Sequence, residues 1–200
     1  MSRILVLYYS RFGATAQMAE LIADGIESVA GCEAMLRTVP SVSPDNLASE
    51  PKQPEQGPIY CSETDFKQCD GLILGSPTRF GNMAAPLKYF IDGTGSAWME
   101  GSLVNKPAAC FTSSSSMHGG QESTLLSMSL PLIHHGMLFC GIPFTATELS
   151  ETKTGGTPYG ASHLAGGKSD NPISDSEAAL CKLLGTRVAK IASAIEAADL

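Results

Sequence analysis

Short apolar runs alternate with helix-like stretches from the start of the chain. Residues 4–9 are an unbroken apolar and aromatic run, which predicts a strand buried on both faces. After it, Met18, Ile22 and Ile26 stand four residues apart, the spacing of an amphipathic helix. A turn of hydroxyl-bearing and glycine residues, 10–15, joins the two. A strand, a glycine-containing turn and a helix form the repeating unit of parallel sheets.

The same alternation continues along the chain. Residues 32–39 are a mixed apolar and polar run typical of an edge strand, and Pro40 ends it. Three further apolar runs predict buried strands at 71–75, 107–112 and 137–142. The helical stretches are expected at 66–69, 84–92, 121–135 and from Asp175, which is a suitable N-cap. Pro131, inside one of these helices, should kink or shorten it.

Buried strands that alternate with helices predict an α/β fold. The five strands suit a doubly wound parallel sheet in the order 2-1-3-4-5, with helices on both faces. Two stretches break the pattern. Residues 40–63 are rich in proline and polar residues, and 143–172 are rich in glycine, proline, serine and threonine. We therefore expect a single domain over 1–200 with irregular insertions at about 40–63 and 143–172, and a loop at 93–101.

Composition narrows the class of protein. The chain has 200 residues, a 43% hydrophobic fraction and a net charge of -7, which suit one domain with a full core and argue against a nucleic-acid partner. No apolar run approaches a membrane span, and a strand from residue 4 leaves no room for a signal peptide. The six cysteines include no C-x-x-C pair, so reduced thiols and a cytoplasmic location are expected.

Three loops rich in serine, threonine and glycine follow predicted strands, at 10–15, 76–82 and 113–120. Ligands of doubly wound sheets bind at the carboxyl ends of the strands. The free N–H groups at a helix start bind phosphate without lysine or arginine. The first turn alone is equally compatible with an ordinary capped helix start. The three loops together predict a cleft for a phosphate and a flat polar ligand.

Several other classes of α/β protein are disfavoured because the chain lacks the residues that their chemistry requires. The chain has no G-x-x-x-x-G-K-[ST] phosphate loop, and its first turn is not G-x-G-x-x-G, which disfavours P-loop nucleotidases and Rossmann dinucleotide binding. A phospho-acceptor receiver would need acidic residues where Tyr9, Ser10 and Ser76 stand. Residues 160–164 only partly match the G-x-S-x-G elbow of serine hydrolases. His134 and His135 are adjacent in the sequence, which is a poor arrangement for binding one metal ion, so no metal is expected.

Five segments carry a resemblance to a known family. They are LVLYYS with Gly13 (5–13), GSPTRFGNM (75–83), GGQE (119–122), HHGM (134–137) and GGTPYGAS (155–162). Together they resemble the WrbA family of NAD(P)H:quinone oxidoreductases, which has the flavodoxin-like fold. The resemblance implies a cytoplasmic homotetramer that binds FMN and reduces quinones by two electrons, with NADH or NADPH as the donor.

The resemblance also implies the site residues. Ser10, Arg11, Phe12, Gly13, Ala14 and Thr15 match the phosphate loop, in which Phe12 replaces the usual tyrosine and keeps the ring without the hydroxyl. The two loops that hold the isoalloxazine ring match at Thr78, Arg79, Phe80 and Gly81 and at Ser113, Ser114, Ser115, Ser116, Met117 and His118. His134 matches the flavin-side histidine, and Trp98 matches the aromatic wall of the substrate pocket, with Phe80 and Phe12 as further walls.

The residue types suit this chemistry. Backbone amides and hydroxyls can hold an FMN phosphate in an acidic protein, and one slot that takes nicotinamide and then quinone implies ping-pong turnover. Our hypothesis is that His134 or a water gives a proton to the quinol oxygen, since imidazole transfers protons near neutral pH. The alternatives are a one-electron flavodoxin-type carrier and a flavin-free scaffold.

Overall fold

A parallel sheet forms the centre of the protein. The computed structural model describes residues 1–42, 54 and 57–198. The strand order is β2-β1-β3-β4-β5, and β6 also pairs with β4. The strands are β1 (Ser2–Tyr8), β2 (Cys32–Thr38), β3 (Gly71–Pro77), β4 (Pro107–Ser114), β5 (Leu138–Phe139) and β6 (Ala161–Leu164). All pairings are parallel, which confirms the predicted α/β class, the order 2-1-3-4-5 and the edge position of β2.

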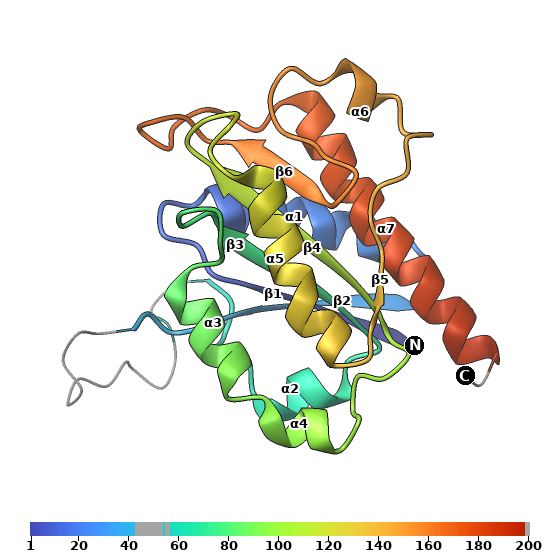
Figure 1. Cartoon of the computed structure of the whole chain (residues 1–200). Helices are drawn as coiled ribbons and strands as arrows, with labels where there is room; N and C mark the ends of the chain where they lie inside the picture. The colour runs from blue at the N-terminus through green and yellow to red at the C-terminus, as the bar shows by residue number, and fades with distance from the viewer. Residues whose placement is uncertain (43–53, 55–56, 199–200) are drawn as a thin grey trace.

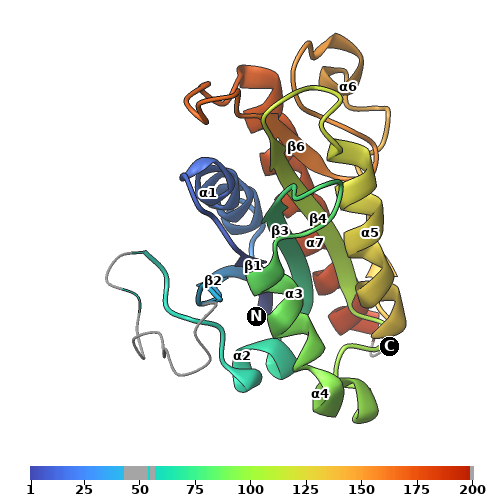
Figure 2. The same ribbon diagram turned by 60° about the vertical axis from the view of Figure 1, so that its left-hand side comes forward.

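Helices cover both faces of the sheet. Figures 1 and 2 show α1 and α7 on one face, and α3, α4 and α5 on the other. The helices are α1 (Ala14–Glu27), α2 (Glu63–Gln68), α3 (Ala85–Asp92), α4 (Gly95–Met99), α5 (Gln121–His134), α6 (Glu148–Glu151) and α7 (Asp175–Ala198). No helix in the described part of the chain has the length and apolar character needed to cross a membrane.

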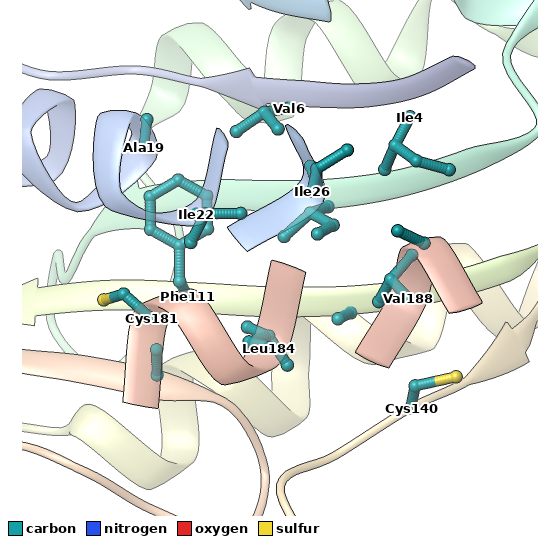
Figure 3. Packing of buried hydrophobic residues seen from close by; sticks show 14 of the residues in the cluster. Ile4, Val6, Ala19, Ile22, Ile26, Phe111, Cys140, Cys181, Leu184 and Val188 are labelled. Carbon is teal, nitrogen blue, oxygen red and sulfur yellow. The ribbon is translucent and has the colours of Figure 1, made fainter. Parts of the chain in front are cut away.

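Strand β1 lies at the centre of two hydrophobic cores. Ile4 and Val6 pack toward α1 and α7, as Figure 3 shows, while Leu5 and Leu7 pack toward the opposite face. All four side chains are fully buried. An apolar run without alternation is what a strand covered on both sides requires, and the prediction for residues 4–9 rested on that pattern.

The position of the fifth strand is divided between two short strands. β5 pairs only with Pro107 and Ala108, and β6 pairs with Phe111 through Ser114. The prediction of one strand over 137–142 is therefore wrong in length, and the stretch 143–172 is not wholly irregular. Between the two strands the chain leaves the sheet, and it returns at Gly160. A Cβ there would lie 2.1 Å from the carbonyl oxygen of Cys110, so β6 can begin beside β4 only with a glycine.

Some expected boundaries also differ. The loop predicted at 93–101 contains α4, and α5 continues past Pro131 to His134, so the proline does not shorten it. Ser174, rather than Asp175, caps α7: its hydroxyl accepts a hydrogen bond from the Glu177 amide at 3.4 Å, and its amide donates to the Glu177 carboxylate at 2.8 Å. This is a capping box, which the sequence S-x-x-E encodes.

The predicted insertion at 40–63 is described only in part. Residues 43–53 and 55–56 lie outside the described residues. At its end, Tyr60 forms a parallel bridge with Thr38, and α2 begins at Glu63, three residues before the expected start at 66.

Candidate functional site

A cavity of about 320 Å³ opens at the carboxyl ends of β1, β3 and β4. This is the edge at which a doubly wound sheet binds its ligands. The three predicted loops all reach it, together with a fourth segment that follows β6. The lining residues are Ser10, Arg11, Phe12, Ala14, Thr15, Pro77, Thr78, Arg79, Ser113, Ser114, Ser115, Ala165, Gly167 and Ser169.

The first loop ends at the N-terminus of α1. Gly13, the N-cap residue, adopts a left-handed conformation with φ of 93° and has no side chain that could cap the helix. The Ser10 hydroxyl accepts a hydrogen bond from the Ala16 amide at 3.3 Å. Among the described residues, the amides of Ala14 and Thr15 have no acceptor. Free amides at the positive end of a helix dipole are suited to a phosphate dianion.

Thr15 joins the first loop to the end of β4. Its hydroxyl shares a hydrogen bond of 3.0 Å with the hydroxyl of Ser113, and both side chains are buried. The two hydroxyls lie on adjacent parts of the cavity wall. A buried pair of hydroxyls can keep this bond and still offer lone pairs or a proton to a ligand.

The second loop is a tight turn that holds one aromatic side chain in solvent. The Arg79 amide donates to the Asn82 carbonyl at 2.7 Å, and the Asn82 amide donates back at 3.0 Å. Between them, Phe80 and Gly81 have positive φ values of 53° and 75°. A phenylalanine rarely adopts this conformation, which costs about 1–2 kcal/mol. The Phe80 ring is fully exposed beside the cavity.

The second and third loops brace each other. The Thr78 amide donates to the Ser113 carbonyl at 2.8 Å, and the Thr124 hydroxyl donates to the Thr78 hydroxyl at 2.8 Å. Gly120 has φ of 93°, and a Cβ on it would lie 2.9 Å from the Gly81 Cα. The glycine thus lets the two loops come into contact, which fixes the wall for a flat ligand.

A buried polar network supports the third loop from below. Gln121, at the start of α5, donates to the Ser114 hydroxyl at 2.9 Å and accepts from the Ser162 hydroxyl at 2.6 Å. Ser114 in turn donates to the Ser116 carbonyl at 2.9 Å. Sequence reasoning missed the structural role of Gln121. The only signal was a polar residue at the start of a helix that follows a glycine pair.

The fourth segment, 165–169, was also missed. Its residues reach the cavity because β6 pairs with the carboxyl-terminal half of β4, which ends at the cavity. Only the topology of the sheet indicates this segment. β5 has two residues and pairs with the start of β4, so it does not extend to the cavity, and a different segment lines the cavity beside the end of β4. Just before this segment, His163 Nδ1 lies 3.0 Å from Glu177 Oε2 in a fully buried pair.

Positive charge borders the cavity. Arg11 and Arg79 line it, and no carboxylate does so among the described residues. The Arg79 guanidinium donates to the Thr78 carbonyl at 2.7 Å, and the Arg11 guanidinium carbon lies 5.2 Å from the Phe12 ring centroid. Free amides, hydroxyls and two guanidinium groups fit the phosphate and polar edge of FMN.

The structure places the remaining predicted residues farther out. Ser116, Met117 and His118 are exposed at the end of the third loop. Trp98 and His134 line a separate depression of about 390 Å³, where the Trp98 indole N–H donates to the His134 carbonyl at 2.9 Å. His134 ends α5, about 20 Å from its first residue at 1.5 Å per residue. Within one chain, these two residues do not reach the cavity.

The neighbouring His135 is a buried structural residue. Its Nε2 lies 2.9 Å from the Thr94 hydroxyl oxygen, and that hydroxyl donates to the Ile91 carbonyl at 2.7 Å. Burial lowers the pKa of His135, and the nearby His134 lowers it further. Because the Thr94 hydroxyl donates to the Ile91 carbonyl, Nε2 of His135 is the donor to Thr94, and the lowered pKa favours the neutral ring.

Comparison with known proteins gives consistent sequence matches. Residues 2–147 match the family model described as NADPH-dependent FMN reductase. A protein of Geobacter sulfurreducens named NAD(P)H dehydrogenase (quinone) is 42% identical over 198 residues, covering 95% of this chain and 97% of the relative. One from Syntrophobacter fumaroxidans with the same name is 43% identical, with the same coverage.

Solved structures show the same fold. A flavodoxin, WrbA-like protein from Agrobacterium tumefaciens matches with a TM-score of 0.66 and 24% identity, covering 97% of this chain and 99% of that one. Two-electron reduced flavodoxin from Megasphaera elsdenii matches with a TM-score of 0.58 and 16% identity, covering 94% and 98%. These structures carry the flavodoxin-like arrangement of sheet and helices.

Proposed function

The chain belongs to the NADPH-dependent FMN reductase family, and on that premise we propose that it is an FMN-dependent NAD(P)H:quinone oxidoreductase. The observation that carries this conclusion is the cavity at the strand ends, which combines unpaired amides, hydroxyls and guanidinium groups. Relatives that share about 40% of its residues over nearly their full length carry the matching enzyme name.

The phosphate of FMN is assigned to the first loop. The free amides of Ala14 and Thr15 and the hydroxyls of Ser10 and Thr15 bind the phosphate oxygens, with the α1 dipole adding to the attraction. FMN, when bound, accepts two electrons from NAD(P)H and passes them to a quinone. The 78–81 turn and the 113–118 loop position the ring and exclude water from one side of it.

The exposed aromatic residues suit a slot for flat substrates. Phe80 and Phe12 are 108% and 66% exposed in the single chain, although large aromatic side chains are usually covered. Both lie at the cavity or directly beside it. They form walls against which a nicotinamide and then a quinone can stack, so one slot serves both substrates in turn.

The distance between the cavity and His134 supports an assembly. We propose a homotetramer in which the depression with Trp98 and His134 from one copy covers the cavity of another. Exposed apolar side chains on α4, on α5, on β5 and in the loop before β4 support it, since exposed apolar surface marks interaction sites. They are Met99, Val104, Leu126, Leu130, Ile133 and Leu138.

In this arrangement His134 gives a proton to the quinol oxygen, and Trp98 closes the substrate slot. Replacing His134 by Gln keeps a hydrogen-bonding side chain and removes the titrating ring. The rate of quinone reduction by pre-reduced protein should fall, while the rate of reduction by NADPH should stay close to wild type. An unchanged quinone rate would exclude the proton-donor role.

We also propose a cytoplasmic location. All six cysteines are free thiols, and five of them are buried. A reducing compartment keeps such thiols unpaired. Cell fractionation of the source organism, with the protein detected by antibody, tests this.

The proposed activity is tested by reconstitution. FMN is added to the purified protein, its absorbance spectrum is recorded, and NADPH and benzoquinone are then supplied. Binding of FMN followed by quinone-dependent oxidation of NADPH supports the proposed oxidoreductase activity. A one-electron carrier would bind FMN without oxidising NADPH at a useful rate, and a scaffold would bind no FMN.

A variant pair makes this test specific to the cavity. Ser10→Asp places a carboxylate where the phosphate should bind, so FMN affinity should fall at least about tenfold by loss of one charge-assisted contact. Ser150→Asp makes the same change on the exposed surface of α6 and should leave FMN affinity unchanged.

A further inference from the structure

A second cavity, of about 560 Å³, adjoins the FMN cavity. The two share Arg11 and Arg79, which stand at the border between them. The second cavity lies between the end of β1, the 79–82 turn and the first turn of α3. Its described lining adds Tyr9, Ser41, Val42, Asn82, Met83, Ala84, Ala85, Pro86 and Lys88.

The charge of this cavity is opposite to that of the chain. The sequence has 13 lysines and arginines against 20 aspartates and glutamates. Three of the 13, Arg11, Arg79 and Lys88, line this one cavity, and none of its described lining residues is a carboxylate. Such a local field attracts an anion that the chain as a whole repels.

The three cations are available to a ligand. No ion pair joins Arg11 or Arg79 to a carboxylate within the described part of the chain. Lys88 pairs with Asp92 one helical turn away, but the two side chains are 54% and 60% exposed. An exposed pair of this kind is weak, so a phosphate can compete with Asp92 for Lys88.

We propose that this cavity binds the phosphate groups of the nicotinamide dinucleotide, with Lys88 as an affinity-determining residue. The inference rests on the proposed function, which requires nicotinamide at the flavin ring. The remaining phosphates of the donor must then lie outside the FMN cavity but close to it. The cavity that shares two arginines with it meets this requirement, and a lysine ammonium binds phosphate as a point charge.

Another hollow, of about 310 Å³, lies beside α3 and does not suit phosphate. Its lining is mainly apolar, with Val39, Phe66 and Phe90 among its residues, and its only charged residue in the described part is Glu63. The charge distribution therefore distinguishes the two hollows and favours the one bordered by Arg11 and Arg79.

The experiment compares Lys88→Glu with Lys190→Glu. Lys88 does not line the FMN cavity, and Lys190 is an exposed residue of α7 on the opposite face of the sheet. Both variants change the net charge by the same amount, so a difference between them comes from position. Lys88→Arg keeps the charge and should keep most of the affinity.

Binding of NADP⁺ to the FMN-loaded protein is measured by titration calorimetry, and the steady-state kinetics with NADPH and quinone are recorded. In Lys88→Glu we expect NADP⁺ affinity and kcat/KM for NADPH to fall about tenfold, the effect of one charge-assisted contact. FMN affinity and kcat/KM for the quinone should match wild type, because ping-pong turnover separates the two half-reactions.

The donor used identifies the phosphate that Lys88 contacts. If kcat/KM of Lys88→Glu falls equally with NADH and NADPH, Lys88 contacts the pyrophosphate. If it falls with NADPH alone, Lys88 contacts the 2′-phosphate. Either result supports the second cavity as the binding site of the donor's phosphates. If Lys88→Glu and Lys190→Glu bind NADP⁺ equally well, the inference is wrong. If the wild-type protein binds FMN and NADP⁺ but reduces no quinone, the proposed function is wrong. The NADP⁺ titration of the two lysine variants then still shows whether the second cavity binds the dinucleotide.

Discussion

At the scale of single residues, Phe80 combines backbone strain with full exposure. Its φ of 53° is unfavourable for a bulky side chain, and its ring packs against nothing in the single chain. Strain of this kind is concentrated at functional sites, where a turn fixes a side chain for a ligand. The fold therefore gains no stability from Phe80.

We predict that Phe80→Asn stabilises the FMN-free chain while weakening the site. Asparagine tolerates the left-handed conformation, so the free energy of unfolding should rise by about 1 kcal/mol. Urea unfolding measures this, and kcat/KM for NADPH and quinone should fall. Phe144→Asn is the control, because Phe144 is 68% exposed but has no positive φ. A loss of stability in Phe80→Asn would mean that another copy covers the ring.

Glu177 is the second residue whose environment decides its role. Burial by itself would raise the pKa of this carboxyl, but hydrogen bonds from the His163 ring and from the amides of Ser174, Leu164 and Gly155 lower it to about 2. The carboxylate ties β6 to the start of α7, directly before the segment that completes the cavity.

The lowered pKa fixes a pH dependence of stability. In the unfolded chain a glutamate has a pKa of about 4.3, so the unfolded state binds more protons below that pH. The contribution of Glu177, about 3 kcal/mol, is complete above pH ~4.3 and is lost as the pH falls toward 2. Urea unfolding of wild type and Glu177→Gln at several pH values should show a stability gap at pH 7 that closes in this range.

The matched change Glu151→Gln, on the exposed end of α6, should leave stability unchanged at every pH. If the gap between wild type and Glu177→Gln stays constant down to pH 2, the carboxylate does not carry the hydrogen bonds that the structure assigns to it.

At the scale of secondary-structure elements, two glycines allow α1 and α7 to cross closely. A Cβ on Gly25 would lie 2.0 Å from the Lys182 carbonyl oxygen, and one on Gly185 would lie 2.1 Å from the Ile22 carbonyl oxygen. Both obstacles are backbone atoms of the facing helix, which cannot rotate away. The two helices must separate to accept any larger residue.

We predict that Gly185→Ala destabilises the protein by about 1–3 kcal/mol, the usual cost of overpacking, although alanine is the better helix former. Thermal unfolding followed by circular dichroism measures the loss. Gly95→Ala in α4 is the control, since a Cβ there has no neighbour within 4 Å. That variant should be unchanged or slightly more stable, and a similar gain in Gly185→Ala would contradict the close crossing.

Elements with long apolar runs could be predicted from the sequence, and those with short ones could not. β1, β3 and β4 are buried on both faces, so each contains a continuous apolar run, and the buried serines and threonine of β3 and β4 come only after that run, toward the cavity. β6 has only four residues, two of them polar, and it owes its place to Gly160 and to its pairing with β4. Such long-range contacts leave no local pattern.

The same distinction applies to the site. The three loops rich in serine, threonine and glycine could be found because each follows a recognisable strand. The 165–169 segment follows β6 and was missed with it. The second cavity, of about 560 Å³, was missed because Arg11 is distant in the sequence from Arg79 and Lys88, and the three side chains meet only in the fold.

At the scale of the whole molecule, helix α5 presents a stripe of exposed apolar side chains. Leu126, Leu130 and Ile133 lie on one side of the helix at i, i+4 and i+7, and they are 45–59% exposed. Such a stripe on a surface helix predicts burial against another copy. Leu130→Glu should therefore shift the protein toward monomer in sedimentation velocity.

The same variant separates cofactor binding from turnover. Leu130 does not line the FMN cavity, so FMN affinity should stay at the wild-type value while quinone reduction falls with the loss of assembly. Lys190→Glu, which changes the opposite face, should leave both unchanged. If monomeric Leu130→Glu keeps full quinone activity, Trp98 and His134 of another copy are not needed.

Subunit mixing tests the shared site directly. At limiting FMN, a chain with Ser10→Asp should be largely without FMN, and a chain with Trp98→Ala should hold FMN without its substrate wall, so each alone should be poorly active. If one copy supplies the cavity and another supplies Trp98, random mixing of the two chains places both intact parts together in about a quarter of the sites. Quinone reduction, assayed after dissociation and reassembly at limiting FMN, should recover to about that share of wild type. A site complete within one chain would recover no activity, because neither chain contains both intact parts.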